Sequence, residues 1–195
     1  MKIYRNYIKR IFDVFFAVFS LFILLPIIIV IMLIYKINHM DIFFIQDRVG
    51  KDCKVFKIYK FKTLKDLNND EKKLTDEERM TKIGRFLRKS SLDEIPQFIN
   101  ILKGEMSLIG PRPLLVSYLN KYENDEIKRH DVMPGITGLA QINGRNDIDF
   151  KKRFEYDLYY SRKISFYIDL KIFLLTIKKV IFADGMRFND KNNFS

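Results

Sequence analysis

The longest apolar segment of the chain lies near its N-terminus. Residues 14–35, VFFAVFSLFILLPIIIVIMLIY, include no charged side chain. As a straight helix these 22 residues would extend roughly 33 Å, enough to cross a hydrocarbon core of about 30 Å. The segment is too long for the apolar part of a cleaved signal peptide, and no small-residue cleavage site follows it. The pattern therefore predicts a helix embedded in a membrane.

Two features favour a re-entrant helix-break-helix over a simple crossing. Pro26 lies just past the middle of the segment, where proline removes a backbone hydrogen bond and bends a helix. Both flanks are basic, and one crossing cannot place both on the cytoplasmic side. The flanking basic residues are Lys2, Arg5, Lys9 and Arg10 before the segment and Lys36, Arg48 and Lys51 after it. A spanning helix kinked at Pro26 remains the alternative.

Polar residues within this region have predicted partners. The Ser20 hydroxyl is a candidate partner for the backbone groups that a break would free. Asp13 lies inside the apolar edge, and we expect it to pair with Lys9 and Arg10, about one turn earlier. We therefore divide the chain into a membrane hairpin, residues 1–38, and a domain at the cytosolic face, residues 39–195.

The remaining hydrophobic pattern predicts a mixed α/β, helix-rich domain. The runs 42–46 and 54–62 are rich in β-forming residues and predict a β-hairpin with Gly50 in its turn. Thr75, with Glu78 three residues later, is typical of a capped helix start. Apolar residues at helical spacing follow at 95–102, and Gly104 is suited to end that helix.

The last third of the chain has weaker periodicity. Residues 105–150 are rich in glycine and proline, which predicts an irregular core with loops. Residues 166–182 are apolar on most faces but carry lysines at 171, 178 and 179. This pattern fits an amphipathic helix lying on a membrane, or a core helix with a lysine face.

Charge and cysteine content restrict the classes of partner and site. The net charge of +11 favours anionic partners: nucleic acid, acidic lipid headgroups or phosphorylated small molecules. Nucleic acid is disfavoured, because the aromatic residues lie within apolar runs and no recognition motif is present. The single cysteine, Cys53, excludes an internal disulfide and a cysteine-based zinc site, and the two histidines are far apart in sequence.

The segment SSLDEIPQ, residues 90–97, contains an adjacent pair of acids, Asp93 and Glu94. Ser91 and Glu94 match the capping-box pattern, and Pro96 suits the first turn of a helix. Capping does not explain why so many cations lie nearby in sequence: Arg85, Arg88, Lys89, Lys103 and Arg112. Helix capping and a chemical role both stay open on these residues alone.

Two further motifs contain arginines suited to phosphate. In Gly110-Pro111-Arg112-Pro113 the prolines restrict the backbone around Arg112, which favours bidentate phosphate binding. An ion pair between Arg112 and a local acid is the alternative. The second motif, PGITGLAQINGRN at 134–146, combines three glycines with Arg145. Glycine-rich loops alone are weak signals, because ordinary turns use the same residues.

Together these motifs resemble a known family, the small monotopic bacterial phosphoglycosyl transferases, also called bacterial sugar transferases. The likeness extends in order from about Lys9 to Lys179, and it is greatest to the undecaprenyl phosphate-dependent enzyme of the Campylobacter N-glycosylation pathway. The motifs that carry it are KRIFD (9–13), QDRVG (46–50), KIYKFKT (57–63), SLDEIPQ (91–97), LKGEMSLIGPRP (102–113), PGITGLAQINGRN (134–146) and SFYIDLK (165–171).

The resemblance implies an activity and a location. Such an enzyme transfers a sugar 1-phosphate from a UDP-sugar to undecaprenyl phosphate and releases UMP, with Mg²⁺ as cofactor. It sits at the cytoplasmic face of the bacterial inner membrane through its re-entrant hairpin and interfacial helices. Membrane lipid, downstream glycosyltransferases and a second copy of the chain are further expected partners. A catalytically inactive membrane scaffold that binds nucleotide-sugars or glycan enzymes is the alternative function.

The resemblance also assigns roles to residues. Asp93 matches the nucleophile that forms a phosphosugar intermediate, and Glu94 matches its partner, so both are candidate Mg²⁺ ligands. The positions linked to substrate binding or site integrity are Lys60, Arg88, Gly110, Pro111, Arg112, Arg145 and Asp169. Because acids at a helix N-terminus have lowered pKa values, we expect Asp93 to keep a low pKa. The transferred sugar is not specified by any of these residues.

Overall fold

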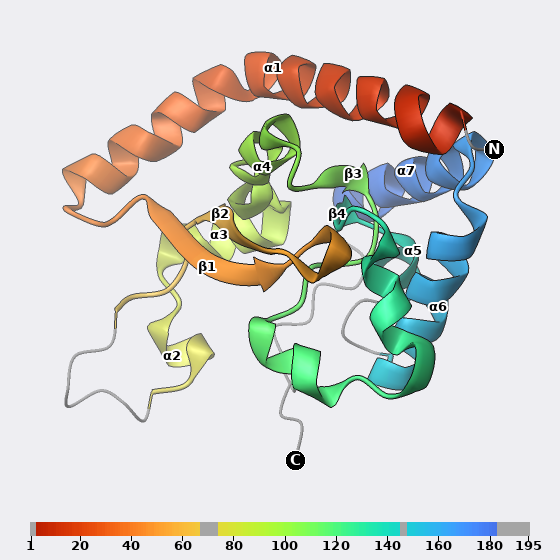
Figure 1. Cartoon of the computed structure of the whole chain (residues 1–195). Helices are drawn as coiled ribbons and strands as arrows, with labels where there is room; N and C mark the ends of the chain where they lie inside the picture. Colours follow the sequence, from red (N-terminus) through yellow and green to blue (C-terminus); the bar gives the residue numbers. More distant parts are fainter. Residues whose placement is uncertain (1–2, 67–73, 145–147, 183–195) are drawn as a thin grey trace.

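Helices dominate the structure, and two small sheets lie among them (Figure 1). The computed structural model describes residues 3–66, 74–144 and 148–182. The helices are α1 (Lys9–Ile37), α2 (Asp76–Arg79), α3 (Lys82–Ser90), α4 (Gln97–Lys103), α5 (Leu139–Ile142), α6 (Phe150–Lys163) and α7 (Phe166–Ile181). The strands are β1 (Phe43–Val49), β2 (Val55–Phe61), β3 (Ser107–Ile109) and β4 (Gly135–Thr137). The predicted mixed, helix-rich fold with a small β-hairpin is confirmed.

The apolar N-terminal segment forms one continuous helix. Together with the π-type turn Tyr4–Ile8, α1 gives a helical stretch of 34 residues with Pro26 inside it. The predicted break is absent: α1 bends part-way along its length but stays one continuous helix (Figure 1). A bend accommodates the proline ring and its missing donor at lower cost than ending the helix. Within the described residues, the Ser20 side chain makes no hydrogen bond to backbone groups.

The surface of α1 distinguishes it from a core helix. Only 17% of its most apolar 18-residue stretch is buried inside the structure, and the helix is long and apolar enough to cross a membrane. It arches over α4, β3 and α7, with Phe16 packed edge-on against Phe173 of α7 (Figure 1). An exposed apolar surface of this size marks a region that water does not normally cover. Its exposed large side chains include Ile11, Phe12, Phe15, Val18, Phe19, Phe22, Ile23, Val30 and Leu33.

The polar start of α1 is fixed to the rest of the molecule. Lys9 Nζ lies 2.9 Å from Asp169 Oδ2 of α7, in a buried ion pair. Asp13 Oδ1 accepts a 2.9 Å hydrogen bond from the backbone amide of Leu108 in β3. We expected Asp13 to bond to Lys9 and Arg10, and the hydrogen bonds show this prediction to be wrong. Lys9 bonds to Asp169, Asp13 bonds to Leu108, and Arg10 donates to the Leu102 carbonyl of α4. These partners lie at least 92 positions apart in the sequence, so a rule based on spacing within one helix could not predict them.

The other end of α1 is fixed to the same unit. The Tyr35 hydroxyl donates a hydrogen bond to the Lys62 carbonyl, just after β2. The Tyr35 ring is fully buried and stacks at 6.4 Å from Phe61. Both ends of the apolar helix thus contact one and the same folded domain, which matters for membrane topology below.

The predicted hairpin is confirmed, and β1 extends past its predicted end. Strands β1 and β2 pair antiparallel from Phe43↔Phe61 to Val49↔Val55. Gly50 and a 3₁₀ turn, Lys51–Cys53, connect them. On its inner face β2 joins a core with α1 and α4 whose buried members are Ala17, Phe56, Ile58, Ile101 and Met106.

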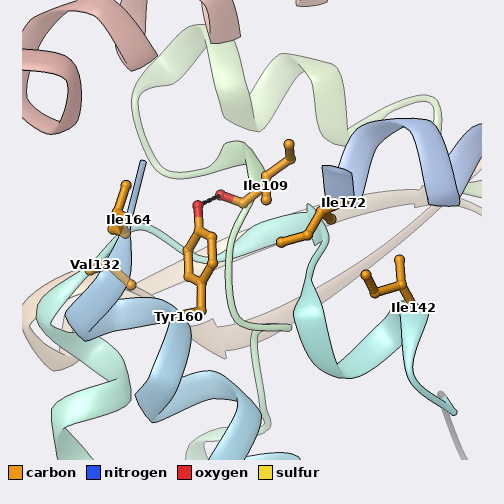
Figure 2. Close-up of a cluster of buried hydrophobic side chains, with 6 residues drawn as sticks. All are labelled: Ile109, Val132, Ile142, Tyr160, Ile164 and Ile172. Atoms are coloured by element: carbon orange, nitrogen blue, oxygen red, sulfur yellow. Dashed lines mark hydrogen bonds between the residues drawn. The ribbon is translucent and has the colours of Figure 1, made fainter. Parts of the chain in front are cut away.

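The glycine-rich region is more ordered than its composition predicted. β3 and β4 form a short parallel pair, with Ser107 opposite Gly135 and Ile109 opposite Thr137. Gly110 and Gly135 allow this approach: a Cβ on Gly110 would lie 2.3 Å from the Met133 carbonyl oxygen, and one on Gly135 would lie 2.1 Å from the Gly110 nitrogen. Ile109 of β3 belongs to a buried cluster with Val132, Ile142, Tyr160, Ile164 and Ile172 (Figure 2).

Other local predictions also hold. Thr75 and Glu78 form the reciprocal capping box at the start of α2. Gly104 ends α4 in the left-handed conformation, with φ of 81°. The helix predicted at 166–182 is confirmed as α7 (Phe166–Ile181), which buries Ile172 and Asp169 and exposes apolar residues elsewhere. The exposed members are Phe166, Tyr167, Leu170, Leu174, Leu175, Ile177 and Val180.

Candidate active site

The acidic pair lies in a short 3₁₀ turn, Leu92–Glu94, between α3 and α4. Ser91 adopts the left-handed conformation, with φ of 57°, and its side chain caps neither segment. Helix α4 begins only at Gln97, after Pro96. The capping interpretation of Ser91 and Glu94 is therefore wrong, and the two acids are available for another role.

Glu94 is held by two cations from different elements. Lys60 of β2 lies 2.7 Å from Glu94 Oε1, and Arg112 Nη2 lies 3.2 Å from the same oxygen. Although burial opposes ionisation, the charges and hydrogen bonds of Lys60 and Arg112 outweigh it and hold the pKa of Glu94 well below its usual range. The ion-pair alternative for Arg112 is thus what the structure shows, and its partner is a residue of the site.

Asp93 differs from its neighbour in environment. Its side chain is buried, with 9% of the residue exposed. Burial, followed by the adjacent Glu94 charge, raises the pKa of Asp93 to about 6, against the opposing effects of Lys60, Arg112 and Arg88. The expected low pKa is wrong, because desolvation outweighs any benefit of a helix terminus.

Arg88 reaches the site from the end of α3. Its Nε donates a 3.0 Å hydrogen bond to the Thr63 hydroxyl, just after β2. Gly84 lets α3 approach this point so closely that a Cβ there would lie 2.1 Å from the Thr63 carbonyl oxygen. The Thr81 side chain caps α3 through the Gly84 amide and donates to the Thr63 carbonyl. Thr63, which sequence analysis did not select, therefore positions Arg88.

The segment that leads into Arg112 is extended, and partners distant in sequence bind its backbone. The Leu108 amide bonds to Asp13, and the Gly110 amide donates to the Thr137 carbonyl at 2.8 Å. Several carbonyls of this segment accept hydrogen bonds from distant donors. The Ile109 carbonyl accepts from Tyr160 Oη (3.0 Å), and the Pro111 carbonyl accepts from the Gly135 amide (2.9 Å). The carbonyls of Arg112, Pro113 and Leu114 accept from Arg129 Nη2 (2.8 Å), Arg48 Nη1 (3.4 Å) and the Val49 amide (3.0 Å), respectively. Residues 108–114 are hereafter called the anchored segment.

The structure separates the remaining predicted site residues. Gly110 and Pro111 belong to the anchored segment and place Arg112. Arg145 lies outside the described residues. Asp169 does not contact the Asp93–Glu94 pair; it accepts from Lys9, Tyr4 and Tyr160. Figure 2 shows the Tyr160 hydroxyl bonded to the Ile109 carbonyl, so Asp169 touches the anchored segment through Tyr160.

The described site defines a class of protein. A carboxylate pair, with Asp93 buried and Glu94 partly buried, faces three cations, Lys60, Arg88 and Arg112, next to a long apolar surface. Such a site suits an anionic substrate that is processed at a membrane surface. In agreement, the family model for bacterial sugar transferases matches residues 4–183, and the chain belongs to that family.

Individual relatives differ in how much of their length this chain covers. It is 46% identical over 182 residues to an uncharacterized sugar transferase, EpsL, of Bacillus subtilis (strain 168), covering 92% of this chain and 90% of EpsL. It is 47% identical over 149 residues to the UDP-glucose:undecaprenyl-phosphate glucose-1-phosphate transferase of Klebsiella pneumoniae, covering 71% of this chain. It is 42% identical over 156 residues to the undecaprenyl-phosphate galactose phosphotransferase of Salmonella typhimurium (strain LT2), again covering 71% of this chain.

These comparisons support an enzyme that transfers a sugar phosphate. The chain spans 32% of the Klebsiella relative and 33% of the Salmonella relative, so the activity of those whole proteins is carried over only as a proposal. The special likeness to the Campylobacter enzyme stays a prediction.

The raised pKa of Asp93 predicts that its charge destabilises the fold. Because the folded pKa of about 6 exceeds the ordinary value of 3.8, stability falls as pH rises between these values. We expect Asp93→Asn to raise the free energy of unfolding by roughly 1–3 kcal/mol at pH 7.5, and the gain to vanish below about pH 4. Denaturant unfolding in detergent at both pH values measures the difference.

Asp47 provides the matched control, because its side chain is exposed and pairs with Lys57 on the hairpin surface. Asp47→Asn should give no such gain at either pH. A destabilised or unchanged Asp93→Asn protein at pH 7.5 would contradict the assignment of a desolvated carboxylate.

Proposed function

We propose that this chain transfers a sugar 1-phosphate from a UDP-sugar to undecaprenyl phosphate and releases UMP, through a phosphosugar intermediate on Asp93. The observation that carries the proposal is the buried Asp93 carboxylate beside Glu94, whose charge Lys60 and Arg112 already balance. The names of the Klebsiella and Salmonella relatives support the two substrates. Glucose and galactose are the sugars that those names contain, and the sugar used by this chain is left open.

The first step needs an ionised carboxylate close to a diphosphate. One Asp93 oxygen attacks the phosphorus that carries the sugar. The bond from that phosphorus to the bridging oxygen breaks, and UMP leaves with this oxygen and its electron pair. Lys60, Arg88 and Arg112 counter the charge of the diphosphate. A pKa near 6 leaves most Asp93 ionised at neutral pH while making it more basic than an ordinary aspartate.

The second step transfers the sugar phosphate to the lipid. An oxygen of undecaprenyl phosphate attacks the same phosphorus, the bond between phosphorus and the Asp93 oxygen breaks, and the carboxylate is restored. A covalent intermediate lets one site serve a water-soluble donor and a membrane-bound acceptor in turn. The exposed apolar surfaces of α1 and α7 would place the site at the membrane where the acceptor resides.

The residues present fit a Mg²⁺ ion. Asp93 and Glu94 offer adjacent carboxylates, and both cations that bind Glu94 contact Oε1 rather than Oε2. Among the described residues no group of three acidic, histidine or cysteine side chains could hold a metal, so phosphate and water oxygens would complete the coordination, as Mg²⁺ prefers. When bound, the ion would neutralise charge on the diphosphate.

The attachment of α1 at both ends supports the re-entrant topology. Lys9 and Asp13 contact Asp169 and Leu108, whereas Tyr35 contacts Lys62 at the far end of the helix. A simple crossing would require these contacts to form on opposite sides of the bilayer. We therefore propose that α1 enters and leaves on the cytoplasmic side of the bacterial inner membrane, bent rather than broken at Pro26.

The proposed chemistry predicts UMP release that depends on Asp93. Detergent-solubilised protein with Mg²⁺, undecaprenyl phosphate and a panel of UDP-sugars should release UMP with at least one sugar. Asp93→Asn should reduce the rate by about a thousandfold or more, because the amide cannot act as the nucleophile. Since Asp93 reacts as the carboxylate, the rate should rise with pH up to about 6 and level off above it.

Two outcomes would count against this proposal. An Asp93→Asn variant with the wild-type rate would remove the nucleophile assignment. Silence of the wild type with every donor sugar would favour the alternative, an inactive membrane scaffold. Asp47→Asn serves as the control for a lost surface carboxylate and should keep full activity.

Topology makes a separate prediction. If α1 is re-entrant, cysteines introduced at Ile3 and at His39 should both react with a membrane-impermeant thiol reagent only in inside-out membrane vesicles. The background for this labelling is a Cys53→Ser chain. Labelling of the Ile3 site in right-side-out vesicles would show a spanning helix and contradict the proposal.

A further inference from the structure

Arg112 is held both through its side chain and through its main chain. Its guanidinium contacts Glu94 in the site, whereas its backbone carbonyl accepts a 2.8 Å hydrogen bond from Arg129 Nη2. Arg129 belongs to the 3₁₀ segment Asn124–Asp131, which contributes neither the acidic pair nor the cations around it. The contact is thus between an interior arginine and the main chain of a site arginine.

Arg129 is unusually deeply buried for a cation. Its side chain and that of Asp157 on α6 are each 1% exposed. Arg129 Nε and Nη2 lie 3.0 and 2.6 Å from Asp157 Oδ2, and Nη1 lies 3.4 Å from the Tyr122 hydroxyl. Phe154 lies under the guanidinium, 5.5 Å from its central carbon. Burial of such a pair is costly because both ions lose their hydration, so the pair is weak evidence for a role in stability alone.

The geometry requires an arginine rather than any cation. The planar guanidinium donates from three nitrogens in fixed directions: Nη2 binds both Asp157 and the Arg112 carbonyl, while Nε binds Asp157 and Nη1 binds the Tyr122 hydroxyl. A lysine would keep the charge beside Asp157 but has one nitrogen on a flexible stem. Removal of the donor leaves the Arg112 carbonyl without this bond and loosens the residue whose side chain meets Glu94.

We propose that Arg129, held by Asp157, is a positioning residue that fixes Arg112 toward Glu94 through the Arg112 main-chain carbonyl. The catalytic part of this inference rests on the proposed function, whereas its structural part does not. Arg129 touches no reacting atom; it acts through Arg112. Residue 112 belongs to no helix or strand, so no regular backbone hydrogen bond is available to the Arg112 carbonyl. The Arg129 side chain supplies the donor for this carbonyl instead.

Hydrogen exchange tests the structural part independently of substrate. In Arg129→Lys we expect faster amide exchange in a peptide covering 108–115, with exchange in α1 and the β1–β2 hairpin unchanged. Lys128→Ala is the matched control, because Lys128 is the adjacent cation but is half exposed and pairs with Asp125. Unchanged exchange in residues 108–115 of Arg129→Lys overturns the proposal.

A double-mutant cycle tests whether Arg129 acts through Arg112. With UMP release from a radiolabelled donor as the readout, Arg129→Lys should lower kcat between about ten- and a hundredfold in the wild-type background. In the Arg112→Ala background the same change should cost little further. Equal fold losses in both backgrounds would show a general structural role and overturn the proposal.

An apolar pair separates positioning from stability. Arg129→Met with Asp157→Leu removes both buried charges, and such replacements are often neutral for stability. We expect this variant to unfold near the wild-type temperature and still to lose activity. Wild-type turnover by it would contradict the inference. If the wild type itself releases no UMP, the proposed function fails, and the exchange comparison alone decides the role of Arg129.

Discussion

The buried polar contacts at the start of α1 are the constraint on which the rest of the structure depends. Lys9 and Asp13 lie at the edge of a long apolar helix, where an unpaired charge would be costly. They find partners in Asp169 and in the backbone of Leu108. The same bonds that satisfy the helix therefore fix α7 and β3 against it. The helix thus packs against the rest of the described structure, and the division of the chain at residue 38 stays a prediction.

From β3 the constraint continues along the chain into the site. Residues 108–114 are extended, and their backbone groups bind Asp13, Tyr160, Arg129, Arg48 and two strands instead of a single sheet. Such a segment has few alternative conformations, so Arg112 meets Glu94 without reorganisation. The charge on Glu94 is then balanced, and the cost of burial falls on Asp93. A desolvated carboxylate with a raised pKa beside fixed cations is an arrangement that suits nucleophilic attack on a phosphate.

Local sequence patterns predicted the local parts of this structure well. Periodicity and charge located α1, the hairpin and α7, and the Thr75–Glu78 box was correct because capping depends on neighbours in sequence. What failed depended on distant contacts. Pro26 lies inside α1 without ending it, Asp13 bonds to a residue 95 positions away, and burial raises the pKa of Asp93. Arg129 and Asp157 show no local signal at all, because an ion pair 28 residues apart forms only when α6 packs.

The central claim is that Asp93 becomes covalently bound to the sugar phosphate. Protein incubated with the UDP-sugar that supports UMP release, without undecaprenyl phosphate, should be quenched, digested and analysed by mass spectrometry. The account predicts that the peptide containing Asp93 gains the mass of one sugar phosphate, and that subsequent addition of undecaprenyl phosphate removes it. Wild-type release of UMP with no adduct on Asp93, or with the adduct on another residue, would contradict it.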